Sequence, residues 1–529
     1  MKLAYNIASV ALIVISLVYP VVVLTIFPKW VIDDAFITFR YADNFAKHSE
    51  LTWNIGELPI EGYTGVALPV LLAGFIKLGF DPIDVSHAIG VSAYFLGWLM
   101  LLLVLRKLRI NKLVSGLTLL FYSTTPIFFT HALSGLETML FVATILASFY
   151  WLLRVVFDAE NKKSSTTVFF LFSLIVGFVR PEGVAWAGFA ISAATYVQFK
   201  HHRNALKFFA ALFTIFYFVP AMIYFLWRWN YYGALLPNTY YAKQLASLDI
   251  SLIVWISRFF RAYFAIPFVS VFLLILPAAD WLWEKIKSKE NGLWDQRLWP
   301  LISAVVAFMA LLFLVYSRSH LTTNFSERFY VPFMPFFWIG LAYLLNLGSL
   351  GINQIKETKP VSYKLALFLL IVLSTYQIAF QIVKISGEMR FAREEKLDKE
   401  GMHYLAGKFL KETLSSSDWL VVYIDAGAIP YFSGMKTIDF GALNDSVLAR
   451  RNLSLKERVE YFYLKNPAAA VFTSSSLDKV IYTTESDAIT NDLRFQNYIL
   501  AKKYISPVDR QVNWYELLFL RKDIYAKLK

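Results

Sequence analysis

Long runs of apolar residues, separated by short polar loops, fill the chain from its first residues to about position 384. The first run covers residues 4–27, and about 24 apolar positions are enough for a helix to cross a bilayer. A signal peptide would have a shorter apolar core and a cleavage site of small residues, whereas this run ends in Pro28-Lys29-Trp30. The pattern therefore predicts a retained first span. Ten further apolar runs, which give about eleven predicted transmembrane helices in all, lie at 84–105, 113–130, 138–157, 166–180, 183–199, 207–228, 263–283, 299–317, 331–347 and 363–383.

Residues 66–80 are also apolar, but this run is only about 15 residues long and contains Pro69, Gly74 and Lys77. Such a length suits a helix in the membrane interface better than one that crosses the membrane. The positive-inside rule supports this interpretation. If 66–80 does not cross, the cytoplasmic side receives all the loops rich in lysine and arginine, at Arg106–Lys112, Lys162–Lys163, Lys200–Lys207, Lys285–Arg297 and Lys356–Lys359.

This topology places the candidate chemistry on the outer face of the membrane, where ATP and nucleotide sugars are not available. The first outer loop, residues 28–83, begins with an acidic pair and is expected to contain helices that lie along the membrane surface. The other polar groups on this side are Glu137, Arg180, Glu182, the 229–250 loop, Arg328 and the whole tail.

The charge distribution divides the chain into two parts. Residues 1–384 hold 49 charged side chains, about 13% of the positions, and residues 385–529 hold 40, about 28%. We therefore predict a membrane domain over 1–384 and a soluble domain over 385–529. Most of the net charge of +13 belongs to the membrane domain, where it fits loops that face an anionic leaflet rather than a nucleic-acid surface. The composition, 57% hydrophobic with no cysteine, excludes intrinsic disorder, disulfides and cysteine nucleophiles.

The tail has the pattern of a domain with both helices and strands. Runs of β-branched and aromatic residues predict strands at 419–424, 468–473 and 514–520. Residues 395–414 have a helical pattern, and AGAIPYFSG, which follows Asp425, is predicted to be a turn or a short helix. These elements predict a soluble α/β domain of roughly 140 residues, which is large enough to have its own core.

Asp33 and Asp34 follow the first span directly. Two adjacent carboxylates repel each other, so one of them is expected to have a raised pKa, and such a group at the lipid surface can accept a proton from a hydroxyl. The alternative is structural, because aspartate is a good N-cap and favours the dipole of the helix that follows. That helix is amphipathic, with Phe36, Phe39 and Phe45 near one face, and is expected to lie in the membrane interface.

Glu137 lies in SGLETM, and Arg180 and Glu182 lie in VRPEG, each between two closely spaced spans. Charged residues at this depth are costly unless they pair with one another or line an aqueous cavity. They form either a buried ion pair that joins helix ends or part of a substrate site. Arg180 and Arg328 suit a phosphate, because a guanidinium offers paired donors and keeps its charge.

The outer loop YYGALLPNTYYAKQ, residues 231–244, contains Asn238, Tyr240, Tyr241 and Lys243. Tyrosine rings pack against sugar rings and amides bind sugar hydroxyls, although tyrosines are also common in the aromatic belt at the headgroup level. The combination with an amide and a lysine favours a ligand site.

The sequence contains no metal-binding signature such as HExxH, and His201 and His202 lie in a basic cytoplasmic loop. No nucleotide-binding glycine motif is present either. The sequence identifies no cofactor with certainty, and a divalent metal is possible but has no support in the sequence. His320, in the polar outer loop SRSH, is a further candidate site residue, although most loop histidines have no catalytic role.

Eight short motifs occur in one order along the chain: DDAFITFRYADNFA, WNIGE, EGYTG, SGLET, VRPEG, YYGALLPNTYYAK, ERFYVPFMP and DAGAIPYFSG with IDFGALND. Between about residues 30 and 445 the chain thus resembles the bacterial GT-C membrane glycosyltransferases related to the mycobacterial terminal arabinofuranosyltransferase. The resemblance implies a polytopic GT-C fold and a sugar donor linked to polyprenyl phosphate. It also implies that Asp33 matches the catalytic carboxylate and that Asp34 assists it.

Together these observations predict a multi-pass glycosyltransferase of the bacterial inner membrane, with its active site and soluble domain in the periplasm. The expected sugar is a pentose, D-arabinofuranose, and the acceptor is a hydroxyl of a cell-surface polysaccharide, lipopolysaccharide or pilin-type protein. Cationic side chains would stabilise the phosphate leaving group while a carboxylate accepts the hydroxyl proton. The candidates for binding the donor are Arg40, Glu137, Arg180, Glu182, Asn238, Tyr240, Tyr241, Lys243, His320 and Arg328.

Three questions stay open at this point. The sequence does not decide between retention and inversion, because Asp34 could also act as a second carboxylate in a double displacement. A lipid-linked glycan ligase or polymerase on a similar scaffold would use a diphosphate-linked donor. The non-enzymatic alternative is a transporter of lipids or sugars. The polar groups of a transporter should be spread through the depth of the membrane.

Overall fold

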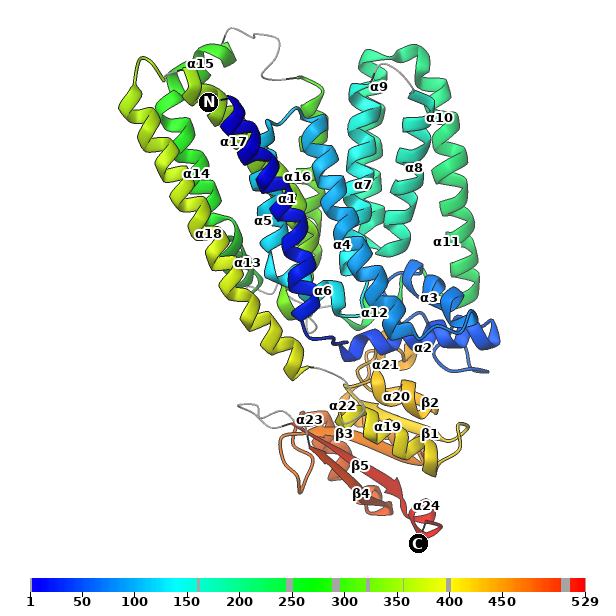
Figure 1. Cartoon of the computed structure of the whole chain (residues 1–529). Coiled ribbons are helices and arrows are strands. Elements are labelled where there is room, and N and C mark those ends of the chain that lie inside the picture. The colour runs from blue at the N-terminus through cyan, green and yellow to red at the C-terminus, as the bar shows by residue number, and fades with distance from the viewer. Residues whose placement is uncertain are drawn as a thin grey trace.

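In the computed structural model the chain forms a long helical bundle with a smaller domain, built on a five-stranded sheet, at one end (Figure 1). The structure describes residues 2–158, 162–243, 251–287, 295–319, 324–354, 356–395, 401–505 and 514–528. The predicted fold class, a helical multi-pass membrane protein with a C-terminal α/β domain, is confirmed.

The helices of the bundle follow the apolar runs of the sequence. They are α1 (Lys2–Ile26), α4 (Pro82–Lys107), α5 (Lys112–Thr124), α6 (Pro126–Leu133), α7 (Thr138–Phe157), α8 (Lys162–Val179), α9 (Glu182–His201), α10 (Leu206–Phe213), α11 (Val219–Tyr232), α13 (Ser251–Tyr263), α14 (Ala265–Ile275), α16 (Leu298–Tyr316), α17 (Met334–Gln354) and α18 (Pro360–Glu394). A shorter helix, α15 (Ala279–Lys287), follows α14.

Seven helical stretches among the described residues are long and apolar enough to cross a membrane, and two bent pairs, α5–α6 and α13–α14, raise the number to nine. The bend of 54° between α5 and α6 occurs at Pro126, which has no N–H to continue the hydrogen bonding of α5. The predicted number of eleven transmembrane helices is reached only when α8 and α9 are also counted as spans. These two pack against α7 in the same bundle, but α8 is short and α9 contains Glu182, Gln198 and Lys200.

The outer surface of the bundle is apolar, as contact with lipid requires. Val14 of α1, Leu226 of α11, Val306 of α16 and Phe368 of α18 are all exposed. A continuous apolar surface of this kind is not tolerated in water, and the backbone groups beneath it are satisfied within the helices.

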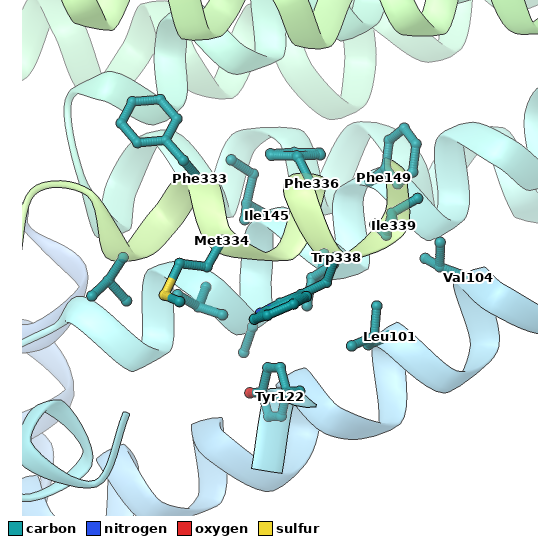
Figure 2. Close-up of a cluster of buried hydrophobic side chains, with 14 of the residues drawn as sticks. Leu101, Val104, Tyr122, Ile145, Phe149, Phe333, Met334, Phe336, Trp338 and Ile339 are labelled. Atoms are coloured by element: carbon teal, nitrogen blue, oxygen red, sulfur yellow. The ribbon is translucent and has the colours of Figure 1, made fainter. Parts of the chain in front are cut away.

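The centre of the bundle is a close-packed apolar core, in which rings of α17 face α5 and α7 (Figure 2). Trp338 stacks on Phe121 with ring centroids 5.3 Å apart, and Phe336 meets Phe149 edge-on at 5.6 Å. Packing of this density resists shifts of one helix against another. The helix ends that carry polar residues are therefore held in fixed positions.

Helix α2 (Asp33–His48) lies across the end of the bundle on which the C-terminal domain sits (Figure 1). Its aromatic face is covered by that domain, because the ring of Phe36 lies 5.4 Å from Tyr431 and 5.1 Å from Phe432. The helix was expected to lie in the membrane interface, but the structure covers this face with protein instead of lipid. Basic segments of the sequence lie at the turns after α4, α9 and α17. These turns are at the end of the bundle opposite to α2 (Figure 1).

The 66–80 segment forms α3 (Ala67–Lys77), which packs against α2. With 11 residues it is too short to cross a bilayer, as expected. Leu68 and Leu72 are buried, whereas Val70, Leu71 and Phe75 are exposed. This division between an inner and an outer apolar face is typical of a helix that lies against a membrane.

The C-terminal domain consists of one sheet with the strand order β2–β1–β3–β5–β4 and helices on both faces. Strand β1 is parallel to β2 and β3, and β5 is antiparallel to β3 and β4. The elements are α19 (Met402–Thr413), β1 (Trp419–Tyr423), α20 (Ala428–Ser433), β2 (Lys436–Asp439), α21 (Ser446–Arg450), α22 (Leu455–Lys465), β3 (Ala469–Ser474), α23 (Thr484–Thr490), β4 (Tyr498–Ile505), β5 (Tyr515–Arg521) and α24 (Lys522–Ala526).

The sequence pattern of β1 shows why this sheet has helices on both faces. Leu420 and Val422 pack toward α19 and α20, while Val421 and Tyr423 pack toward the opposite helices, since successive strand residues point to opposite sides. The three predicted strands correspond to β1, β3 and β5, and the predicted helix and turn to α19 and α20. The boundary predicted after residue 384 falls inside α18, which continues to Glu394, so the connection between the two parts begins after this helix.

Candidate active site

The two carboxylates at the start of α2 contact different parts of the protein. Neither side chain caps α2 itself, so the structural alternative of a local N-cap is not realised. Asp33 is turned toward the C-terminal domain and Asp34 toward the helix ends of the bundle. The pair therefore lies at the boundary between the two parts of the molecule.

Asp33 accepts two backbone hydrogen bonds from the first residues of α20. The N–H of Gly427 donates to its Oδ2 and the N–H of Ala428 to its Oδ1, each over 2.8 Å. Asp33 thus caps a helix 394 positions away in the sequence. Burial raises the pKa of Asp33 to about 6, although nearby His403 acts in the opposite direction.

Asp34 lies 3.8 Å from Arg328, at the beginning of a group of six charged side chains. Glu137 bridges two arginines, since its Oε1 accepts from Arg328 Nη2 and from Arg180 Nη1, both over 3.2 Å. Arg180 also binds Glu182 over 2.9 Å, and the side chains of Arg180 and Glu137 are almost completely buried. Ion pairs this deep are stable only with well-placed partners, which is the case here.

Lys243 completes this group at the end of α12 (Asn238–Ala242). Its Nζ lies 5.8 Å from the ring centroid of Phe329, and Arg180 and Arg328 lie within 5.6 and 5.7 Å of the same ring. Burial lowers the pKa of Lys243, while the charge of Asp34 acts in the opposite direction. We refer to Asp34, Glu137, Arg180, Glu182, Lys243 and Arg328 as the charged cluster.

The charged cluster contains three carboxylates and three cations. The hydrogen-bond donors of its two arginines are used to different extents. Arg180 uses Nη1 on Glu137 and both Nε and Nη2 on Glu182. Arg328 has a buried Nε without a hydrogen-bond partner among the described residues, and its contact with Asp34 is long. Arg328 therefore has donors available for a ligand, whereas Arg180 is committed to its glutamates.

The backbone just before Arg328 is strained. Ser326 and Glu327 have φ values of 41° and 54°, in the left-handed region that side chains other than glycine rarely adopt. The turn is held from two sides, because the carbonyl of Ser326 lies 2.9 Å from His131 Nε2 and its hydroxyl donates to Glu388 over 2.7 Å. Strain of this kind persists where surrounding contacts fix it, often at functional sites.

Two predicted donor-binding residues have other roles. Arg40 stacks on Trp53 and donates to the carbonyls of Trp53, Pro430 and Met435 and to Asn54. All three of its nitrogens donate within the protein, and two of these bonds, to Pro430 and Met435, join α2 to the C-terminal domain. Its predicted role in donor binding stays a prediction, and these contacts favour a structural role instead.

Asn238 is the second such residue, and it is completely buried. Its amide group donates to the carbonyls of Ala442, Leu443 and Asp445, and its oxygen accepts from Arg450. It attaches α12 to the C-terminal domain and is closed to a sugar.

The remaining predicted residues are not part of the charged cluster. Tyr240 is exposed and meets Tyr241 edge-on at 5.8 Å, and Arg450 lies over the ring of Tyr241 at 5.5 Å. His320 lies outside the described residues. Two cavities of about 510 and 490 Å³ lie elsewhere, one between α9 and α16 and one beside α24, and neither is lined by the charged cluster.

A second polar group, next to Asp33, was not predicted from the sequence. It consists of His403 in α19, Asp425 after β1 and Glu516 in β5, whose ligand atoms all lie within 4.8 Å of one another. Burial raises the pKa of Glu516 to about 8. Burial also acts to raise the pKa of Asp425, but contact with His403 brings it down to about 2. No spacing motif reveals this group, because its members come from distant segments.

Comparisons with solved structures place this geometry in a known fold. Over 98% of its length the chain is similar to 99% of ArnT from Cupriavidus metallidurans in the apo state, with a TM-score of 0.55 and 13% identity. The same ArnT bound to undecaprenyl phosphate matches with a TM-score of 0.53 and 12% identity, over 96% of this chain and 97% of that one.

An oligosaccharyltransferase from Archaeoglobus fulgidus, solved with Zn and sulfate, matches 87% of this chain with 67% of its own, at a TM-score of 0.52 and 12% identity. These likenesses show that the chain has the GT-C fold. Residues 389–518 match a family described as a domain of unknown function (DUF8728). A search among curated proteins found no match.

Proposed function

We propose that the protein transfers a sugar from a polyprenyl-phosphate donor to a hydroxyl acceptor, with the charged cluster as its active site. The observation that carries this proposal is the meeting of Asp34 with Arg328 and Lys243 at the end of the bundle where α2 lies. The fold supports the proposal, because ArnT, with the same fold, binds undecaprenyl phosphate. The basic loops at the opposite end support an extracytoplasmic, periplasmic site.

The leaving group of such a donor is a lipid phosphate, which needs cations more than it needs an acid. Arg328 has free donors and Lys243 is buried close by, so these two would hold the phosphate. Arg180 would act indirectly, since Glu137 connects it to Arg328 and keeps that side chain in place.

Asp34 is our candidate for the proton acceptor. The acceptor oxygen forms a bond to the anomeric carbon, the bond from that carbon to the phosphate oxygen breaks, and the hydroxyl proton moves to Asp34. Polyprenyl phosphate leaves with the electron pair of the broken bond. The resemblance assigned this role to Asp33, but both oxygens of Asp33 already accept backbone hydrogen bonds, whereas Asp34 faces the cations. We therefore propose Asp33 as a residue that positions the C-terminal domain.

The finer identity of the substrates rests on the sequence motifs. They support D-arabinofuranose as the sugar and a cell-surface glycan, lipopolysaccharide or pilin-type protein as the acceptor. Residues of the charged cluster lie at or next to the ends of α7, α8, α9 and α12 instead of spreading along the helices, which favours transfer over transport.

The proposal is tested with the purified full-length protein and synthetic prenyl-phosphoryl arabinofuranose. Asp34→Asn should lower the rate of transfer about 10²–10⁴-fold, the usual contribution of a general base. Asp43→Asn is a matched control, since Asp43 lies on the same helix and pairs with solvent-exposed Lys47. A full rate in Asp34→Asn would overturn its role, and transfer only from a diphosphate-linked donor would identify a ligase or polymerase instead.

A further inference from the structure

The group formed by His403, Asp425 and Glu516 has the dimensions of a metal site. His403 Nε2 lies 3.4 Å from Glu516 Oε1 and 3.7 Å from Asp425 Oδ2. Two ligands of a tetrahedral zinc ion, each about 2.1 Å from the metal, lie about 3.4 Å apart. The three side chains are therefore spaced as if around a common ion, without being bonded to one another.

Their place in the sheet is one where ligands commonly bind. The chain leaves β1 toward β2 on one side, and β3 lies on the other, so the carboxyl end of β1 is a topological switch point. Asp425 follows β1 at this edge, and Glu516 lies directly opposite Thr473 at the end of β3. Crevices at such points are the usual binding sites of open α/β sheets.

Three buried polar atoms of this group lack a hydrogen-bond partner among the described residues. Only 8% of His403 and 1% of Glu516 is exposed, yet neither ring nitrogen of His403 nor Glu516 Oε2 has a hydrogen-bond partner among the described residues. Leaving buried polar atoms unpaired is costly, so unpaired atoms of His403 and Glu516 in one buried group indicate a missing ligand.

We propose that His403, Asp425 and Glu516 bind a divalent transition-metal ion, Zn²⁺ or Mn²⁺, at the junction between the C-terminal domain and α2. An imidazole with two carboxylates suits these ions, whereas Ca²⁺ and Mg²⁺ prefer ligands that are all oxygen. Thr473 would orient the ligands, because its Oγ1 lies 2.8 Å from Asp425 Oδ2 and 3.1 Å from Glu516 Oε1.

The ion would connect the two parts of the protein. When Nε2 of His403 faces the metal, Nδ1 is on the side of Asp33, whose Oδ1 lies 3.9 Å away. A histidine that binds a metal through one nitrogen commonly directs the other at a carboxylate. The site therefore stabilises the contact between α19 and the first turn of α2. This role does not depend on the proposed transfer reaction.

The experiment uses the full-length protein in detergent, stripped with a chelator and then equilibrated with Zn²⁺, Mn²⁺, Mg²⁺ or Ca²⁺ in turn. We expect about one Zn²⁺ or Mn²⁺ per chain by elemental analysis, a higher Tm with either ion, and slower proteolysis between α18 and α19. Mg²⁺ and Ca²⁺ should have no effect at the same concentration.

His403→Gln and Glu516→Gln should each remove the bound ion and the metal-dependent rise in Tm. Glu485→Gln is the matched control, because Glu485 is a partly buried carboxylate of the same domain that pairs with Tyr423 and Arg458. Asp425→Asn, which keeps the shape of the side chain, provides a second test if the other variants do not fold.

The absence of stoichiometric binding in the wild-type chain would overturn the proposal and leave His403 as a buried cation between carboxylates. Binding that persists in all three ligand variants would overturn it as well. Since metal content is measured without substrate, failure of the transfer assay has no bearing on this result.

Discussion

Gly427 donates its backbone N–H to Asp33 over 2.8 Å, so the first turn of α2 and the first turn of α20 are in direct contact. The approach is so close that a Cβ atom on Gly427 would lie 1.9 Å from the carbonyl oxygen of Asp33. Only a residue without a side chain allows it. The position of the C-terminal domain on the bundle therefore depends on this glycine.

Gly427→Ala should push the C-terminal domain away from α2, because the new methyl group meets backbone and cannot be avoided by a side-chain rotation. The expected cost is about 1–3 kcal/mol, visible as a lower Tm and faster proteolysis between α18 and α19. Gly387→Ala in α18 is the control, since a Cβ there meets no atom within 4 Å. Equal behaviour of the two variants would contradict the described docking.

Arg40→Met should separate the two parts of the protein more severely. The methionine fills similar space but removes every hydrogen bond of the guanidinium, including those to the carbonyls of Pro430 and Met435. A hydrogen bond from a charged donor contributes about 1.5–3 kcal/mol. Lys436→Met removes another contact across the same boundary, the pair with Glu57, but that pair is exposed and should contribute less than about 1 kcal/mol. Unfolding in denaturant would compare the two variants.

Arg328→Lys should weaken donor binding while the fold is retained. A lysine keeps the positive charge but has a single nitrogen, so it cannot reproduce the fork with which Arg328 contacts Asp34 and Glu137 through Nη1 and Nη2 and keeps Nε for a phosphate. Loss of one charged hydrogen bond, about 1.5–3 kcal/mol, corresponds to a rise in KM of about 10- to 150-fold. A KM unchanged from the wild type would remove Arg328 from the phosphate site.

The pH dependence of transfer should reflect Lys243. Burial lowers its pKa from the usual 10.5, so it loses its charge, and its attraction for phosphate, at a lower pH than an exposed lysine. Activity should therefore decline on the alkaline side below pH 10.5. Between the lowered pKa of Lys243 in the folded chain and 10.5, the unfolded chain binds more protons at this position than the folded chain. This group alone therefore makes the free energy of unfolding rise with pH in that interval.

Lys243→Arg tests this explanation, because a guanidinium stays charged and should move the alkaline decline to higher pH. The measurement is KM as a function of pH, with Tm recorded in the same buffers to detect unfolding. An alkaline decline at the same pH in both proteins would show that another group titrates.

Much of the fold follows from local patterns in the sequence. The apolar runs locate the bundle helices, and β1 and β3 are visible because they are short, apolar and β-branched. Strands β2 and β4 were missed for a physical reason: β2 has only four residues, and β4 reads YILAKKYI with exposed lysines. Both are edge strands, where pairing with one neighbour, more than the residue pattern, determines the structure.

The charged cluster was anticipated, since charge at helix ends on one side of a membrane must find partners. Four residues show that residue type alone does not determine whether a side chain belongs to a site. Arg40 and Asn238 have the chemistry of ligand-binding residues, but they donate hydrogen bonds to backbone carbonyls of the C-terminal domain. His403 and Glu516 were missed because they come together only through the sheet topology.

The contacts of Asp33 and Arg40 with the C-terminal domain can form only late in synthesis of the chain. Asp33 and Arg40 emerge from the ribosome early, whereas Gly427, Pro430 and Met435 are made only after the last helix of the bundle. Until then Asp33 has no backbone donor from α20, and the guanidinium of Arg40 has only its partners in the first loop, Trp53 and Asn54. A chain that ends before α20 would therefore lack these contacts, so α2 can dock against the C-terminal domain only at a late stage of translation.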